Sequence, residues 1–154
     1  DSGTYTHNVG YLNISNGAFH YVYFDSQRDP NNDPLVLWMN GGPGCSSLIG
    51  MVYENGPFVF KPNTTISRLI SMLGILRQSP VHHIPQGVGF STGSTDNLND
   101  GTVAKYNLEA LNQFFLKFPN LKNNDFYMSG ESYAWIYVPL LAIEIINYNK
   151  LESS

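Results

Sequence analysis

Residues 126–139 read Phe-Tyr-Met-Ser-Gly-Glu-Ser-Tyr-Ala-Trp-Ile-Tyr-Val-Pro, and this stretch decides the fold of the 154-residue chain. The apolar run over 125–129 predicts a short β-strand, and the pattern over 133–149 predicts a helix in which Pro139 causes a kink or a late start. Between them, Ser132 lies two residues after a glycine and two before an alanine. A serine in such a strand–turn–helix is typical of a nucleophile elbow, because the tight turn exposes the hydroxyl beside backbone N–H groups that favour negative charge.

A glycine-rich loop lies upstream of this turn. Leu35–Met39 is continuously apolar, which predicts a strand buried on both faces, as in an α/β sheet. It runs into Asn-Gly-Gly-Pro-Gly-Cys-Ser-Ser over 40–47, where backbone N–H groups face the surrounding space. By itself this loop is equally an ordinary tight turn. In α/β hydrolases, however, a loop after an upstream strand supplies the second oxyanion donor, and the order here is the one that arrangement needs.

Turn residues and periodicity predict three further elements. Asn16-Gly17 stands between the apolar and aromatic runs 11–14 and 18–24, which predicts a β-hairpin. An apolar stripe with helical spacing predicts a helix over 102–118, capped at 100–102 and stopped by the proline that follows.

Composition narrows the function classes. Hydrophobic residues make up 42% of the chain and charged residues only 13%, with a net charge of −4, so neither disorder nor a basic nucleic-acid surface is expected. No apolar run reaches the roughly 18 residues of a membrane span. The chain opens at Asp1 with a polar segment, so we expect a mature product or a piece of one. Oligomeric state is left open.

Two N-glycosylation sequons, at Asn13 and Asn63, favour a secretory route. Cys45 is the only cysteine. It is either a free buried thiol or half of a disulfide whose partner lies outside the chain.

The histidines give weak signals for a catalytic base. The chain has four, and none lies in a context that predicts this role: His7, His20, His82 and His83. The adjacent pair has no third ligand at zinc spacing, so no metal site is predicted. No cofactor motif occurs either.

Taken together, the motifs resemble the serine carboxypeptidases, a secreted, lysosomal or vacuolar family with the α/β-hydrolase fold. The motifs that carry the resemblance lie in family order at 37–47, 53–58, 87–91, 130–134 and 137–139. The resemblance implies that residues 1–154 are the N-terminal part of a single α/β-hydrolase domain, truncated after the helix that follows the elbow. It implies hydrolysis of the C-terminal peptide bond of a peptide or protein substrate with a free C-terminus.

Specific roles follow from the resemblance. It makes Ser132 the nucleophile that forms the acyl-enzyme. The backbone N–H groups of Gly42 and Tyr133 become the oxyanion hole, and removing one such donor typically costs ~3 kcal/mol of transition-state stabilisation. Cys45 pairs, in the family, with a later cysteine. No metal or cofactor is implied.

The resemblance also implies a site for the substrate's terminal carboxylate. Asn40, the N–H of Gly41 and Glu131 hold it, with Glu54 beside Glu131. Two ionised glutamates would repel a carboxylate, so we expect the pair to share a proton and donate a hydrogen bond to the substrate.

Three departures from the family pattern stand out. Trp135 replaces a glycine and is expected to crowd the elbow helix. Residues 66–86 do not follow the family pattern, which puts one central strand in doubt. The catalytic Asp and His of the family lie further downstream than Ser154. The sequence therefore also allows a carboxypeptidase-like acyltransferase, or a truncated or decayed non-catalytic product, and it leaves the preferred substrate side chain open.

Overall fold

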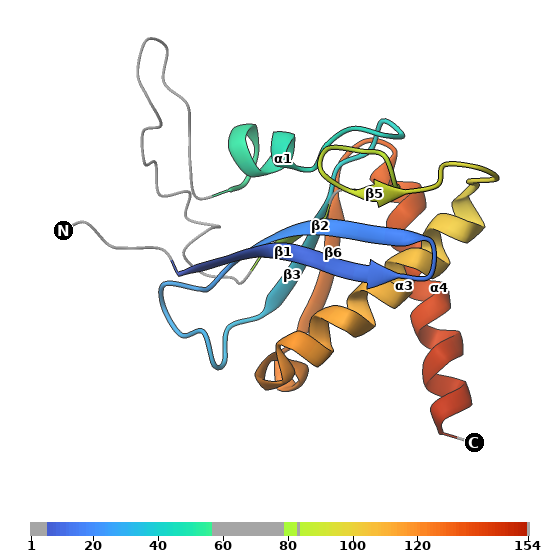
Figure 1. Cartoon of the computed structure of the whole chain (residues 1–154). Coiled ribbons are helices and arrows are strands. Elements are labelled where there is room, and N and C mark those ends of the chain that lie inside the picture. The colour runs from blue at the N-terminus through green and yellow to red at the C-terminus, as the bar shows by residue number, and fades with distance from the viewer. Residues whose placement is uncertain (1–5, 57–78, 83, 154) are drawn as a thin grey trace, which may run out of the picture.

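The structure is a computed structural model that describes residues 6–56, 79–82 and 84–153 (Figure 1). Asn63, His83 and most of the divergent segment 66–86 lie outside the described residues. In chain order the elements are β1 (His7–Ile14), β2 (Gly17–Phe24), β3 (Leu35–Met39), α1 (Leu48–Tyr53), β4 (Ser79–His82), β5 (Thr92–Gly93), α3 (Asp100–Lys117), the 3₁₀-helix η1 (Pro119–Asn123), β6 (Phe126–Gly130) and α4 (Ala134–Glu152).

The sheet is mixed, with strand order β1-β2-β4-β3-β6 and the short β5 paired to β2. β1, β2 and β4 are antiparallel neighbours, whereas β4, β3 and β6 run parallel. Leu35 pairs with Phe126 and Met39 with Gly130, so β3 and β6 end side by side. The loop after β3 and the turn after β6 therefore both begin at the carboxyl ends of their strands, on the same side of the sheet.

β3 and β6 form where their sequences predict them. All five residues of β3 are buried, as a strand covered on both faces requires. β6 is the edge strand and is only partly buried, and Tyr127 is 56% exposed.

The N-terminal hairpin differs slightly from its prediction. β1 begins at His7, and Ile14 pairs with Gly17, so the two turn residues are Ser15 and Asn16 rather than Asn16 and Gly17. Gly17 has φ +141°, and a Cβ atom on it would lie 2.6 Å from the Cα of Gly93 in β5. Glycine is needed there because β5 packs against the start of β2.

β4 fills the centre of the sheet. This strand lies between β2 and β3, and its Val81 pairs with both Val22 and Trp38. The doubt about a central strand in the segment 66–86 does not apply to Ser79–His82, since these residues join the antiparallel and parallel parts of the sheet.

The two long helices begin close to their predicted starts, α3 two residues earlier and α4 one residue later. α3 begins at Asp100, and its N-cap is Asn99, whose side chain accepts a hydrogen bond from the Thr102 N–H. Thr102 bonds back to the N-cap backbone, completing a capping box. α4 begins at Ala134 and continues through Pro139, so a late start is wrong.

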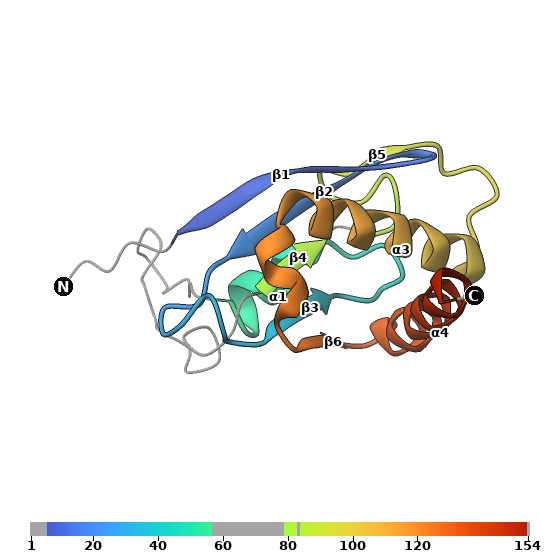
Figure 2. The ribbon, with the colours of Figure 1, turned by 90° about the horizontal axis from the view of Figure 1, so that it is seen from below.

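α3 and α4 lie next to each other, and α1 lies apart from them (Figures 1 and 2). Phe114 of α3 is fully buried against the hairpin, with its ring centroid 6.2 Å from that of Tyr21 and 5.6 Å from that of Tyr23. These aromatic contacts fix α3 on the sheet. Because α4 packs against α3, they also help to fix the turn at the start of α4. In the described part of the chain, no helix is long and apolar enough to cross a membrane.

Candidate active site

Ser132 occupies a sharp turn between the end of β6 and the start of α4. Its φ of 55° lies in the left-handed region, which is strained for a residue with a side chain, and the residue is exposed. A Cβ atom on Gly130 would lie 2.5 Å from the Cβ of Ala134. The small residues on both sides of Ser132 are therefore required for the strand and helix to approach, which is the geometry that the sequence predicts for an elbow.

The loop after β3 lies directly against this turn. Gly41 is buried, and a Cβ atom on it would lie 2.8 Å from the Cα of Tyr133 and would overlap its backbone nitrogen. Gly42 has φ +112°, a conformation that L side chains rarely adopt. Gly42, Ser132 and Tyr133 line one open hollow of about 560 Å³ together with Trp135. The structure thus brings the predicted nucleophile and both predicted oxyanion donors to one surface.

Asn40 joins the two glutamates predicted for carboxylate binding. Its side chain is buried, with 1% exposure, and its Nδ2 lies 3.2 Å from both Glu54 Oε1 and Glu131 Oε1. Its Oδ1 accepts hydrogen bonds from Trp38 Nε1 at 2.9 Å and from the Gly50 N–H at 3.0 Å. These two donors fix the amide so that its N–H groups face the carboxyls. Glu54 and Glu131 remain exposed, so they are available to a ligand.

Three further contacts hold the turn, and none of them is predicted from the sequence. The Tyr133 hydroxyl donates to Asp100 in the first turn of α3, and this contact raises the pKa of Tyr133. Tyr137 packs its ring edge-on against Tyr133, and burial raises the pKa of Tyr137 to about 12. The backbone of Gly44 also hydrogen bonds to Tyr137. The spacing of four residues between the tyrosines, which places them on one helix face, is the signal that could have revealed this pair.

Three sequence-based expectations can be compared with residue exposure. The expectation that Trp135 crowds the elbow helix is wrong, because its side chain is 78% exposed. Cys45 is exposed, which excludes the buried-thiol interpretation and keeps it accessible to a partner cysteine. Asn13 is exposed on β1, as a glycan acceptor requires.

His20 is buried in β2. Its ring packs edge-on against Tyr11 and Phe90, at centroid distances of 5.4 and 5.2 Å, and burial lowers its pKa. His7 and His82 lie in β1 and β4. Among the residues that the structure describes, no group of three or more His, Cys, Asp or Glu side chains is placed to hold a metal ion.

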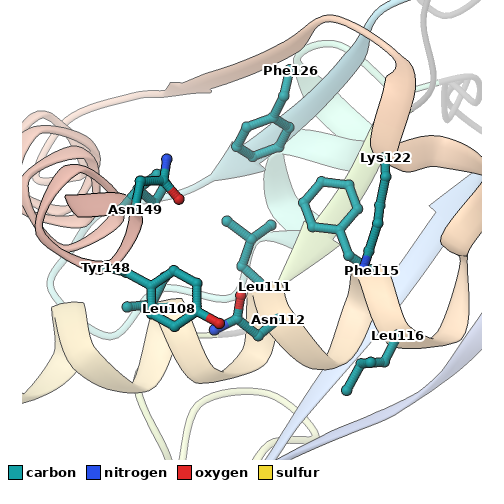
Figure 3. Close-up of a pocket in the computed structure, with 10 residues that line it drawn as sticks. Leu108, Leu111, Asn112, Phe115, Leu116, Lys122, Phe126, Tyr148 and Asn149 are labelled. Atoms are coloured by element: carbon teal, nitrogen blue, oxygen red, sulfur yellow. The ribbon is translucent and has the colours of Figure 1, made fainter. Parts of the chain in front are cut away.

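A second pocket of about 500 Å³ lies between α3, η1, β6 and the C-terminal half of α4 (Figure 3). Phe115 and Phe126 face into it, and Tyr148 closes it from α4. At 1.5 Å per helical residue, Tyr148 is roughly 20 Å along α4 from the elbow. This pocket is therefore separate from the Ser132 surface.

Comparison with known proteins decides the family. The profile of the serine carboxypeptidase family matches residues 2–154. The chain belongs to the serine carboxypeptidase family. The chain is 45% identical over 142 residues to the lysosomal protective protein of Mus musculus, and the match covers 89% of the chain and 30% of that relative.

Solved structures confirm the α/β-hydrolase fold. The chain superposes with a TM-score of 0.78 on Kex1ΔP, a prohormone-processing carboxypeptidase from Saccharomyces cerevisiae, at 27% identity. The match covers 94% of the chain and 34% of Kex1ΔP. Juvenile hormone epoxide hydrolase from Bombyx mori matches with a TM-score of 0.54 at 18% identity, over 90% of the chain and 28% of that structure, which shows the shared fold alone. The chain thus spans about a third of the length of the proteins it matches.

Proposed function

We propose that the protein carrying this chain is a serine-type carboxypeptidase that removes C-terminal residues through an acyl-enzyme on Ser132. The observation that carries this proposal is the shared surface on which Ser132, the Gly42 backbone and the Tyr133 backbone meet. Family membership supports the reaction class.

In the proposed reaction, Ser132 Oγ attacks the scissile carbonyl and forms a tetrahedral intermediate. The Gly42 and Tyr133 N–H groups stabilise its oxyanion, because fixed backbone dipoles need no reorganisation as the charge develops. A base must take the proton from Ser132 and pass it to the leaving amine. We assign the base to a histidine downstream of the elbow, because the family resemblance implies it.

We assign the substrate's terminal carboxylate to Asn40, the Gly41 N–H and Glu131, with Glu54 adjacent. The Asn40 amide lies between the two glutamates, which supports this assignment. The hydrogen bond that its Oδ1 accepts from Trp38 Nε1 holds its Nδ2 toward the exposed carboxyls. The lysosomal relative and the exposed sequon at Asn13 support a lysosomal, vacuolar or extracellular location reached through the secretory pathway.

The test uses the whole protein encoded by its gene and a set of N-blocked dipeptides. We expect hydrolysis of the free acid, at least about 100-fold slower hydrolysis of the matching C-terminal amide, and no hydrolysis by Ser132→Ala. An acyl ester with an alcohol acceptor is assayed in parallel. Acyl transfer without peptide hydrolysis would favour the acyltransferase alternative, and inactivity on every substrate would favour the non-catalytic product.

A further inference from the structure

Trp135 is an exposed aromatic residue beside the candidate nucleophile. Its side chain is 78% exposed, the largest fraction among the large hydrophobic residues that the structure describes. It stands in the first turn of α4 and lines the 560 Å³ hollow with Gly42, Ser132 and Tyr133. An indole left in water at the mouth of a pocket gains free energy when an apolar group covers it.

The position of Trp135 is fixed by the turn itself. Its backbone N–H donates to the Ser132 carbonyl at 3.2 Å, within the first hydrogen-bonded turn of α4. Tyr133 next to it is held by Asp100, so the polar end of that ring is already bonded. None of the four described residues that line the hollow carries a charge. The hollow therefore suits an apolar group better than a charged one.

The hollow can be assigned to one side of the scissile bond. The hollow is not lined by the residues of the proposed carboxylate site, Asn40, Glu54 and Glu131. The Asn40 amide contacts both glutamates. If these residues hold the terminal carboxylate, the C-terminal residue lies outside the hollow. The space beside Trp135 is then left to the residue that supplies the scissile carbonyl.

We propose that Trp135 is a specificity-determining residue, whose indole forms one wall of the subsite for the penultimate residue of the substrate and selects large apolar or aromatic side chains there. This inference rests on the proposed function for the direction in which the peptide lies. The presence of an aromatic binding site at Trp135 does not depend on turnover.

Binding is measured calorimetrically in the whole protein with Ser132→Ala, which prevents turnover. The probes are two N-blocked dipeptides with C-terminal leucine, one with phenylalanine and one with glycine in the penultimate position. We expect the phenylalanine-to-glycine ratio of affinities to fall about tenfold when Trp135→Ala is added, from lost ring contact and apolar burial. Trp135→Phe should retain most of the ratio, whereas Leu151→Ala, an equally exposed residue near the far end of α4 with 76% exposure, should leave it unchanged.

The outcomes separate the two proposals. A ratio that depends on Trp135 supports the subsite even if the unmodified protein hydrolyses neither peptide, in which case the proposed function alone fails. Hydrolysis with a ratio unaffected by Trp135→Ala overturns the subsite and leaves the function standing. A ratio that rises in Trp135→Ala, which would make the indole an obstacle, also overturns it, as does failure of both peptides to bind.

Discussion

The hydroxyl of Tyr133 lies 3.1 Å from both carboxylate oxygens of Asp100. This contact joins the residue after the nucleophile to the first turn of α3, which is itself held on the hairpin by buried aromatic residues. The backbone N–H of Tyr133 is one of the two proposed oxyanion donors. The side-chain contact therefore positions a backbone group that belongs to the proposed reaction.

Removing either partner of this contact should reduce activity. We expect Tyr133→Phe and Asp100→Ala each to lower kcat by about fivefold with a smaller effect on KM, because a charge-assisted bond of roughly 1 kcal/mol is lost. The double variant should be no worse than either single one, since both remove the same bond. Steady-state kinetics on a blocked dipeptide acid measure this, and additive losses would show that the residues act separately.

Gly41 should tolerate no side chain. A Cβ atom there would overlap the backbone of Tyr133, so we expect Gly41→Ala to displace the oxyanion donor and lower kcat/KM by at least about 100-fold. Gly101→Ala is the matched control, because that glycine lies in the first turn of α3, where alanine is the better helix former. Wild-type kinetics in Gly41→Ala would contradict the close approach of the two loops.

The glutamates beside Asn40 should control how tightly the substrate's terminal carboxylate binds. Glu54→Gln removes one of the two carboxyls beside Asn40, so the substrate carboxylate meets less negative charge. We therefore expect KM for a free-acid dipeptide at pH 7 to be about threefold lower in Glu54→Gln than in the wild type. The same measurement with the dipeptide amide is the control for effects on the rest of the protein. An equal change in KM for the acid and for the amide would contradict the assignment of Glu54 to the carboxylate site.

Asp33 should make stability sensitive to acid. It is 3% exposed and pairs with the Arg28 guanidinium, which together with the Ser26 hydroxyl and the Asp29 N–H holds the pKa of Asp33 below its usual range. The stabilisation is present above the unfolded pKa near 3.9 and is lost as pH falls through the lower folded value. We expect Asp33→Ala to lower Tm by about 5 °C at pH 7.

The control for this prediction is pH itself. The Tm difference between the wild type and Asp33→Ala should shrink as pH falls below the unfolded pKa near 3.9 and through the lower folded pKa, because Asp33 becomes protonated in both states of the wild type. A Tm difference that stays constant from pH 7 to pH 2 would contradict the ionic origin of the effect.

Much of the fold could be predicted because short, local sequence patterns determine it. The buried run Leu35–Met39 and the small residues around Ser132 predict β3 and the elbow directly, since periodicity and turn geometry act over a few residues. β4 could not be predicted in this way. Its four residues contain Pro80 and have no period of their own, and the strand exists because β2 and β3 pair with it on either side.

The candidate site likewise contains residues that local motifs predict and contacts that depend on how distant elements pack. Ser132 and Gly42 lie in motifs with local signals, and the structure places them together. The contact of Asp100 with Tyr133 depends on how α3 and α4 pack, so the sequence indicated only a helix cap at Asp100. For Trp135, the sequence indicates only a bulky side chain in place of a glycine. The direction in which α4 presents Trp135 can be seen only in the structure, where the indole faces solvent beside the nucleophile.

The most direct test of the central claim is mass spectrometry of the whole folded protein after treatment with a fluorophosphonate. This reagent reacts rapidly only with a serine whose hydroxyl is activated by a base and whose oxyanion is stabilised. We expect a single adduct on the peptide that contains Ser132, absent in Ser132→Ala and after heat denaturation. A folded protein that leaves Ser132 unlabelled would contradict the account and favour the non-catalytic product.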